Sequence, residues 1–314
     1  MYLVCGEALF DFFSENDASG LASKVNFKAI AGGSPFNVAV GLRRLGVDAA
    51  LFAGLSTDYL GRRLVQVLHD EGVRPDFLVD VDAPTTLAMV AVGANGSPQY
   101  SFRGEGCADR QLSLAQLPEL GPEVRGLHIG SFSLVVQPIA DTLLALVRRE
   151  SGQRLISLDP NVRLNPEPNI ELWRSRIAEL VQLADLIKVS DEDLHLLYPE
   201  RDPQDVISGW LQHRCQVVFL TRGGEGATVF SRQHGNWSVP ARSVTIADTV
   251  GAGDTFQAAL ITWLTEHRLD SVAGVQQLDR EQISAMLDFA VGAAALTCSK
   301  TGPDLPYRRQ LNLG

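Results

Sequence analysis

Residues 248–255 place two glycines and a carboxylate immediately before a long helical pattern. They read Asp-Thr-Val-Gly-Ala-Gly-Asp-Thr, and apolar residues at helical spacing continue to about residue 267. Gly251 and Gly253 let backbone amides approach a ligand with no side chain in the way. The N-terminus of the helix would direct its free amides and the positive end of its dipole to the same place. The octet therefore predicts a site for an anion such as a phosphate group.

Asp254 would face that anion. A carboxylate opposite a phosphate group is unfavourable for binding alone, because like charges repel. It becomes useful when a neutral hydroxyl lies between the two and must lose its proton to attack phosphorus. We therefore expect Asp254 to be a general base, with its pKa lowered by the helix N-terminus. The amides of Gly251, Ala252 and Gly253 would stabilise charge on the transferring phosphoryl group. A glycine-rich loop in which Asp254 only caps the helix is the alternative.

A second glycine-rich stretch lies near the N-terminus. Residues 31–37 read Ala-Gly-Gly-Ser-Pro-Phe-Asn and lead into a helical pattern over 35–45. Pro35 suits the first turn of a helix. Asn37 would project from that turn with both a donor and an acceptor, which suits sugar hydroxyls. Taken alone, the stretch could be an ordinary glycine turn before a helix.

Four more segments accompany these two in the same order as in a known family. They are Gly-Glu-Ala-Leu-Phe-Asp at 6–11, Gly-Leu-Ser-Thr-Asp at 54–58 with Gly61, Asp-Pro-Asn-Val-Arg at 159–163 and Thr-Arg-Gly-Gly-Glu-Gly at 221–226. Together the six segments resemble the ribokinase-like sugar kinases, also called the PfkB family. The resemblance covers essentially the whole chain.

The resemblance implies a set of sugar-binding residues. Asp11 would accept hydrogen bonds from sugar hydroxyls, Gly33 would bring the backbone against the sugar, and Asn37 would bind its hydroxyls. Arg103 and Arg163 are weaker candidates for contacts with the sugar or with phosphate charge. A loop aspartate and surface arginines are the alternatives for these positions.

The resemblance also implies where the nucleotide binds. The turn at 221–226 would hold nucleotide phosphates through the Thr221 hydroxyl and the amides of Gly223 and Gly226, with Ser190 and Gly253 nearby. Considered alone, that turn is a plain hairpin. No GxxxxGK[ST] stretch occurs in the chain, so a P-loop mechanism is excluded.

Two metal sites follow from the same resemblance. Many family members carry Asn-x-x-Glu where this chain has Ser-Asp-Glu-Asp at 190–193. Asp193 is the aligned acid for placing Mg²⁺ through water, although it is one methylene shorter, and Glu192 is a possible substitute. A K⁺ ion would lie beside Asp248 and backbone carbonyls near 297–302.

The composition is that of a soluble globular protein. Of 314 residues, 45% are hydrophobic and 20% charged. The formal net charge of −10 makes a nucleic acid or an acidic membrane an unsuitable partner. The four cysteines form no CxxC pair, no signal peptide precedes the first strand, and no apolar run is long enough to span a membrane. These features predict a cytoplasmic protein with free thiols.

Strand and helix patterns alternate along the chain. Buried strands are expected at 2–5, 49–53, 126–129, 155–158, 186–189 and 217–220, and helices at 35–45, 61–71, 138–150, 171–183, 203–212, 251–267 and 280–297. This order predicts an α/β fold, with a doubly wound, mostly parallel sheet flanked by helices.

Two stretches lack helical periodicity. Residues of about 10–31 and 85–105 carry strand-like pieces at 27–31, 86–92 and 99–102. The resemblance implies that these pieces form a small β-sheet lid over the sugar, within one kinase domain spanning 1–314. A homodimer through the lid is possible.

Within the family, several segments resemble bacterial fructokinases. They are Gly-Gly-Ser-Pro-Phe-Asn at 32–37, the segment at 6–11 and the Ala108-Asp109 pair that follows Phe102-Arg103. The resemblance implies transfer of the γ-phosphate of ATP to the primary hydroxyl of a ketohexose, D-fructose giving fructose 6-phosphate. One alternative is a 2-keto-3-deoxygluconate kinase, which needs a cation for the carboxylate of its substrate. Another is a sugar or nucleotide sensor without turnover.

Overall fold

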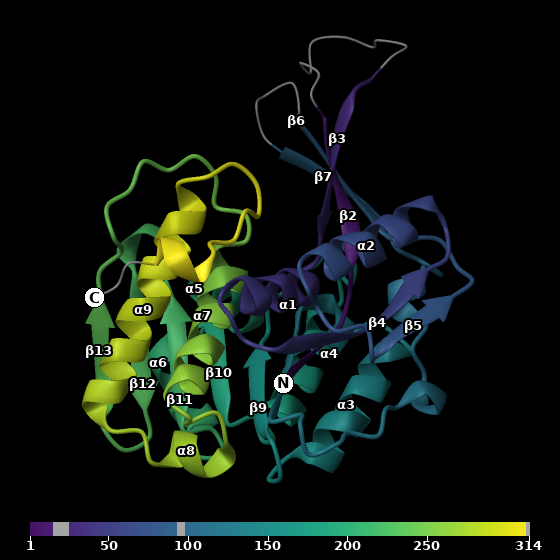
Figure 1. The fold of residues 1–314 in the computed structure, drawn as a ribbon. Helices are drawn as coiled ribbons and strands as arrows, with labels where there is room; N and C mark the ends of the chain where they lie inside the picture. Colours follow the sequence, from purple (N-terminus) through teal and green to yellow (C-terminus); the bar gives the residue numbers. More distant parts are fainter. Residues whose placement is uncertain (15–24, 93–97, 312–314) are drawn as a thin grey trace.

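A large parallel sheet forms the body of the protein (Figure 1). The computed structural model describes residues 1–14, 25–92 and 98–311. Over these residues, one sheet has nine strands in the order β13-β12-β11-β10-β9-β8-β1-β4-β5. The strands from β5 to β11 pair in parallel, and β12 and β13 are antiparallel to their neighbours. The bounds are β1 Tyr2–Cys5, β4 Ala49–Ser56, β5 Leu78–Val81, β8 Gly126–Gly130, β9 Leu155–Asp159, β10 Leu186–Ser190, β11 Val217–Thr221, β12 Ala227–Ser231 and β13 Gly235–Val239.

Helices cover both faces of this sheet, because its central strands are apolar on both sides. One face packs against α1, α2, α7 and α9, and the other against α3, α4, α5 and α6. The predicted doubly wound, mostly parallel fold is confirmed. The helices are α1 Ser34–Arg44, α2 Tyr59–Asp70, α3 Ile139–Glu150, α4 Ile170–Leu180, α5 Asp191–Leu197, α6 Pro203–Trp210, α7 Ala252–Glu266, α8 Val272–Gln276 and α9 Arg280–Cys298. Short 3₁₀ turns occur at Ala108–Arg110, Leu114–Gln116, Ser131–Leu134, Gly223–Glu225 and Arg308–Gln310.

A second, smaller sheet projects from the body at one end (Figure 1). Over the described residues it has four strands in the order β3-β2-β6-β7. The bounds are β2 Leu9–Ser14, β3 Phe27–Gly32, β6 Leu87–Val92 and β7 Pro98–Arg103. The strands occupy the two stretches without helical periodicity, except that β2 begins and β3 ends one residue beyond 10–31. Residues 15–24 and 93–97 of those stretches lie outside the described residues.

The sequence missed four elements of the large body, namely β5, β13, α5 and α8. Helices α5 and α8 have seven and five residues, too few for a helical period to show, and strands β5 and β13 are partly exposed and mix polar with apolar residues, so neither forms an apolar run. Helix α2 also begins two residues before the predicted start. Asp58 caps it by accepting a hydrogen bond from the amide of Gly61 at 2.7 Å.

The carboxyl ends of the parallel strands bring the sequence motifs to one edge of the sheet. β1 leads into Gly6, β9 ends at Asp159, β10 at Ser190 and β11 at Thr221. Ligands bind at this edge in open α/β sheets, because the loops after the strands gather there. Within the described residues, no helix is long and apolar enough to cross a membrane.

Candidate active site

The two glycine motifs meet at Asp254, although they lie about 220 residues apart. The Ser34 hydroxyl donates a hydrogen bond to Oδ1 of Asp254 at 2.7 Å, over a sequence separation of 220. The Asn37 amide nitrogen donates to Oδ2 at 2.8 Å. The first turn of α1 therefore holds the carboxylate that the first turn of α7 carries. The amide of Asn37, which was expected to bind sugar hydroxyls, is directed at Asp254.

Gly251 gives α7 its starting geometry. Its φ of 79° lies in the left-handed region, which glycine adopts without strain. A side chain there would place its Cβ 3.0 Å from the Cβ of Pro303. The amide of Ala252 donates to the carbonyl of Thr249 at 3.2 Å, so it would have to leave that partner to contact a phosphoryl group.

The expectation that the helix N-terminus lowers the pKa of Asp254 is wrong. Burial raises the pKa above its usual value, because the carboxyl group is 8% exposed and loses most of its hydration. The hydrogen bonds from Ser34 and Asn37 oppose the rise, as do the charges of Lys188 and Arg163. A higher pKa makes Asp254 a stronger base than the sequence suggested.

Asp11 lies close to the same place on the smaller sheet. It sits in β2 opposite Ile30, and a side chain at Gly32 would come within 2.4 Å of its Oδ2. Burial raises the pKa of Asp11 to about 6; the charge of Asp254 adds to the rise and Arg163 opposes it. Asp11, Asp254 and Arg163 therefore share one electrostatic environment where the two sheets join.

Gly33 and Arg103 were the other sugar-binding predictions. Gly33 begins α1 with a φ of 102°, and a Cβ there would lie 3.0 Å from the Glu7 carbonyl oxygen. Arg103 ends β7 opposite Leu87 with an exposed side chain. No hydrogen bond or ion pair among the described residues joins Arg103 to the Asp254 cluster.

The turn expected to bind nucleotide follows β11. The Thr221 hydroxyl is 3.5 Å from the Val189 carbonyl oxygen. Gly226 has a φ of 98°, and a Cβ there would lie 2.2 Å from the Val239 carbonyl oxygen, so only glycine fits. Gly223 has open space around it. The turn is a tight hairpin with an accessible glycine, as both interpretations of the sequence require.

Ser190 and Asp193 form a capping box at the start of α5. The amide of Asp193 donates to the Ser190 hydroxyl at 3.0 Å, and the amide of Ser190 donates to Oδ2 of Asp193 at 3.3 Å. Oδ1 of Asp193 accepts from the amide of Val162 at 2.8 Å. The Asp193 side chain thus joins the start of α5 to the 159–163 segment, while Glu192 is exposed.

Asp248 joins the two segments that were expected around K⁺. Its Oδ2 accepts a hydrogen bond from the amide of Gly302 at 2.9 Å, and its Oδ1 accepts from the amide of Val250 at 3.0 Å. The amide of Ala247 donates to the Cys298 carbonyl at 2.8 Å. The loop before α7 therefore lies against the loop after α9.

Sequence reasoning missed Lys188, which lies directly behind the anion site. Its ammonium nitrogen is 2.9 Å from Oδ2 of Asp159, and the two side chains are 5% and 1% exposed. A Cβ on Gly253 would lie 3.0 Å from that nitrogen. The signal was present in the sequence, because Lys188 interrupts an apolar strand and buried lysines are rare unless they are paired.

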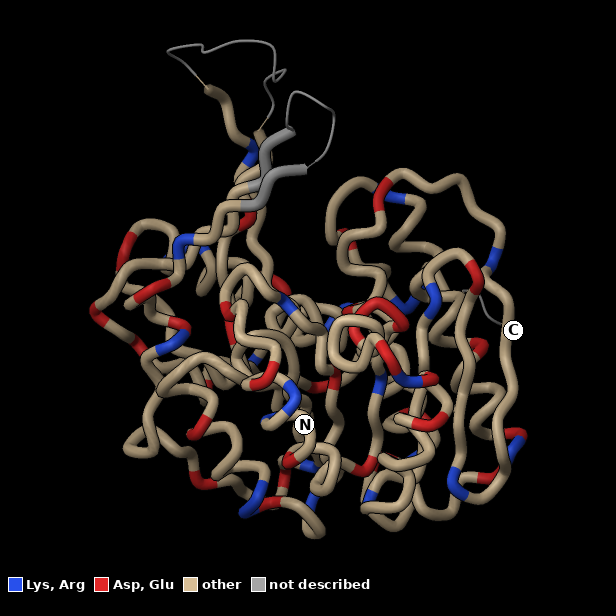
Figure 2. Tube along the Cα trace, turned by 180° about the vertical axis from the view of Figure 1, so that it is seen from behind, with Lys and Arg blue, Asp and Glu red and all other residues tan. Residues whose placement is uncertain are grey.

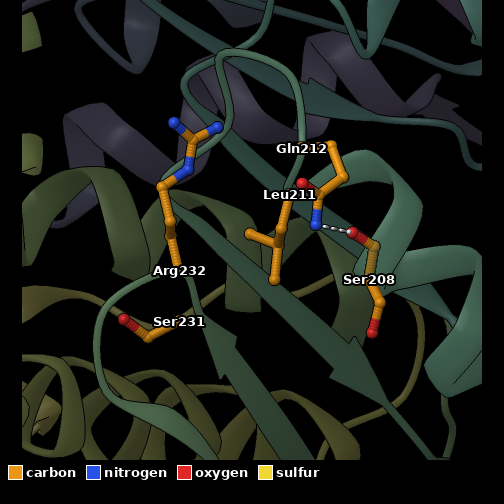
Figure 3. Close-up of a pocket in the computed structure, with 5 residues that line it drawn as sticks. All are labelled: Ser208, Leu211, Gln212, Ser231 and Arg232. Atoms are coloured by element: carbon orange, nitrogen blue, oxygen red, sulfur yellow. Dashed lines mark hydrogen bonds between the residues drawn. The ribbon is translucent and has the colours of Figure 1, made fainter.

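A surface hollow elsewhere carries no comparable set of groups (Figure 3). It is lined by Ser208, Leu211, Gln212, Ser231 and Arg232. These residues lie in the last turn of α6 and just after it, and at the end of β12, near the start of β11 rather than at the carboxyl edge of the sheet. The hollow is therefore separate from the cluster around Asp254.

Comparison with known proteins agrees with this geometry. The family model described as pfkB family carbohydrate kinase matches residues 1–309. The chain belongs to this family. The resemblance read from the sequence is confirmed, and the protein is a carbohydrate kinase, an enzyme that transfers a phosphoryl group to a hydroxyl.

Similar proteins cover nearly the whole kinase. A fructokinase of Rhizobium leguminosarum bv. trifolii is 35% identical over 314 residues, covering 100% of this chain and 93% of the relative. The crystal structure of a Xylella fastidiosa fructokinase with bound ATP has a TM-score of 0.89 and 28% identity, and the match covers 99% of this chain and 96% of that one. A Vibrio cholerae O395 fructokinase double mutant in a fructose, ADP and potassium ion bound form has a TM-score of 0.82 and 25% identity, with 99% and 96% covered.

Proposed function

We propose that this kinase is a fructokinase, which transfers the γ-phosphate of ATP to the 6-hydroxyl of D-fructose and releases ADP. The observation that carries the proposal is the buried Asp254 at the start of α7, held by Ser34 and Asn37 and facing Asp11. The fructokinases of similar sequence and structure support the choice of sugar.

The residues divide the reaction between them. Asp11 accepts hydrogen bonds from the sugar hydroxyls and orients the ring. Asp254 takes the proton of the attacking hydroxyl, and its raised pKa favours that transfer. The amides of Gly251 and Gly253 at the start of α7 stabilise the charge on the phosphoryl group. Arg163, whose charge acts on both aspartates, offsets the repulsion between those carboxylates and an incoming phosphate.

The nucleotide and the metal ions are assigned to the neighbouring loops. The turn after β11, with Thr221, Gly223 and Gly226, holds the phosphates of ATP beside Ser190 and Gly253. Magnesium keeps most of its waters and is carried by substrate phosphates with one or two carboxylates. The described residues contain no group of three potential metal ligands, which fits such a phosphate-borne ion. Asp193 fits contact through water, because both its oxygens already accept amide hydrogen bonds.

Potassium fits the junction that Asp248 makes. The carboxylate and the carbonyls of the 297–302 segment lie together there, and oxygen-rich loops suit K⁺. The ion would supply positive charge beside the loop that leads into α7.

We infer that the smaller sheet is a lid over the sugar within a single kinase domain of residues 1–314. The sheet carries Asp11 on β2, so its position decides whether the sugar site is complete. Val25 and Phe27 on the β3 side are exposed and offer a surface for a homodimer. The four cysteines are free, which suits the reducing cytoplasm.

A coupled assay of ADP release over a panel of sugars tests the substrate. D-fructose should give the highest kcat/KM, whereas 2-keto-3-deoxygluconate and aldohexoses should react more slowly. The position of Arg103, exposed and outside the cluster, does not favour a site built for a sugar acid. A higher kcat/KM for 2-keto-3-deoxygluconate would overturn the choice of fructose. No ADP release with any sugar would support the sensor instead.

A further inference from the structure

Lys188 and Asp159 form an ion pair inside the protein. Lys188 is the central residue of β10 and pairs in register with Phe219, and Asp159 ends β9. The nitrogen–oxygen distance is 2.9 Å, and both side chains are almost fully buried. Oδ1 of Asp159 is buried with no hydrogen-bond partner among the described residues. Removing two charges from water is costly, so the pair needs an explanation beyond stability.

The position of the ammonium group is unusual for its charge. A Cβ at Gly253 would lie 3.0 Å from Lys188 Nζ, so the ammonium lies behind the first turn of α7. That turn is the positive end of the helix dipole, where a cation is disfavoured and an anion is favoured. Asp159 offsets this repulsion from one side. Asp254 follows Gly253 in the same turn, and its charge also acts on Lys188.

Charged groups on several elements act on the Lys188 ammonium. Burial lowers the pKa of Lys188, but attraction by Asp159, Asp193 and Asp254 outweighs burial and raises it, so the lysine stays charged. His128 on β8 is neutral, because burial and the charge of Lys188 lower its pKa to about 3.

Asp254 is in turn surrounded from four elements. Ser34 and Asn37 donate hydrogen bonds to it from α1. The charges of Lys188 on β10 and of Arg163, which follows β9, also act on it. Asp11 on β2 is a second carboxylate, and the charges of Asp11 and Asp254 repel each other. Of these charged groups, Lys188 is enclosed beneath α7, so it can act on Asp254 without contacting a substrate.

We propose that Lys188 is a positioning residue for phosphoryl transfer that acts through Asp254. Its ammonium keeps the Asp254 carboxylate in the deprotonated form that accepts the hydroxyl proton, and Asp159 fixes the ammonium behind the first turn of α7. The role rests on the proposed function of Asp254 as the base. It requires no contact between Lys188 and the sugar.

The test is the pH dependence of kcat/KM for fructose in Lys188→Met. Without the cation, protonation of Asp254 becomes easier, so its pKa rises. The acid limb of the profile should therefore move to higher pH by about one unit, the order of effect expected when a nearby opposite charge is removed. Activity near neutral pH should fall and recover at higher pH. Asp159→Asn should move the limb to lower pH, because it removes an anion that repels Asp254.

Arg214→Met is the matched control. It breaks another ion pair to a buried aspartate, with Arg214 Nε 2.6 Å from Oδ1 of Asp185. Both residues lie just before the amino ends of β10 and β11, away from Asp254. This variant should lose stability in thermal unfolding and leave the acid limb in place. A limb that moves equally in both variants would mean that lost stability, and not charge, moves it.

A direct titration separates Lys188 from the proposed function. The ¹³C signal of the Asp254 carboxyl, assigned by its loss in Asp254→Asn, should titrate at a higher pH in Lys188→Met than in the wild type. An unchanged titration overturns the role of Lys188, even in an active enzyme. A wild type without fructokinase activity would instead overturn the proposed function. The titration would then still decide whether Lys188 lowers the pKa of Asp254. If Lys188→Met does not fold, the double variant that combines it with Asp159→Asn removes both buried charges. The pKa of Asp254 should still rise in the double variant, because Lys188 is expected to act on Asp254 more strongly than Asp159 does.

Discussion

The pKa of Asp254 results from effects that oppose each other. Loss of water raises its pKa, while two hydrogen-bond donors and two nearby cations lower it. A base must accept a proton in the transition state and still be ionised beforehand, so neither effect should dominate completely. The hydrogen bonds from Ser34 and Asn37 and the charges of Lys188 and Arg163 provide this balance.

Asp254→Asn should abolish most of the turnover while leaving the fold intact. The amide oxygen can accept from Asn37, and the amide nitrogen can donate to the Ser34 hydroxyl, so the packing is kept. Loss of a positioned base should lower kcat by about 10²–10⁴-fold, with little change in sugar affinity. Steady-state kinetics and fructose binding by calorimetry measure the two effects. Turnover near the wild-type value would remove Asp254 as the base.

Asp11→Asn should exchange activity for stability. The folded-state pKa of Asp11, about 6, lies above the ordinary value of 3.8, so the native state binds the proton more tightly than the unfolded chain. Its ionisation therefore lowers stability as pH rises from about 4 to about 6. The variant should unfold at a higher temperature than the wild type at pH 8 but not at pH 4, and its kcat/KM for fructose should fall far more than its KM for ATP changes. An equal rise in the two Michaelis constants would contradict the sugar-binding role.

At the scale of secondary-structure elements, the candidate site lies where the N-termini of α1 and α7 come together. α1 and α7 pack against each other, and each begins at a glycine with positive φ. A side chain at Gly33 would press against the Glu7 carbonyl and one at Gly251 against Pro303, so either would displace the first turn that it begins. The C-terminal segment closes this arrangement, since Pro303 lies against Gly251.

Gly251→Ala should therefore damage both stability and catalysis. The left-handed φ and the contact with Pro303 should cost about 1 kcal/mol or more of unfolding free energy. The displaced amides should lower kcat more than they raise the KM for fructose. Gly209→Ala in α6 is the control, because a Cβ there meets open space and alanine should add up to about 1 kcal/mol of stability in a helix. Equal kcat values in the two variants would contradict the assigned role of the α7 amides.

At the scale of the whole molecule, charged residues of both signs occur throughout the described chain. Figure 2 shows Lys and Arg interspersed with Asp and Glu along the chain. The concentration of charge that matters is internal, where Asp11, Asp254, Asp159 and Lys188 converge at the carboxyl edge of the sheet. Cations bound near that edge should consequently affect the rate.

Activity should rise when K⁺ replaces Na⁺ or Tris at constant Mg²⁺ and ionic strength. The reason is the junction of Asp248 with the 297–302 loop, where a K⁺ ion would hold the loop that precedes α7. ADP release measured in the three chloride salts tests this. Asp248→Asn should weaken the dependence on K⁺, and equal rates in all three salts would contradict the potassium site.

The sequence by itself determined the family and the layered α/β fold, and it led to the proposed roles of Asp254 and Asp11. These follow from local signals: glycines before helices, alternation of strand and helix patterns, and motifs in a fixed order. The boundaries of α7 and α9 agree to within a residue or so with the predicted ones, because long apolar periods are clear in the sequence.

Only the tertiary structure decided which groups surround each functional residue. The pKa of Asp254 depends on its burial and on contacts from α1, which lies 217–220 residues away in the chain. The same holds for Asp193, which caps a helix and joins it to the 159–163 segment, and for Lys188 behind Gly253. Desolvation and charge–charge interaction depend on distance in space, and sequence spacing does not record that distance between separate elements.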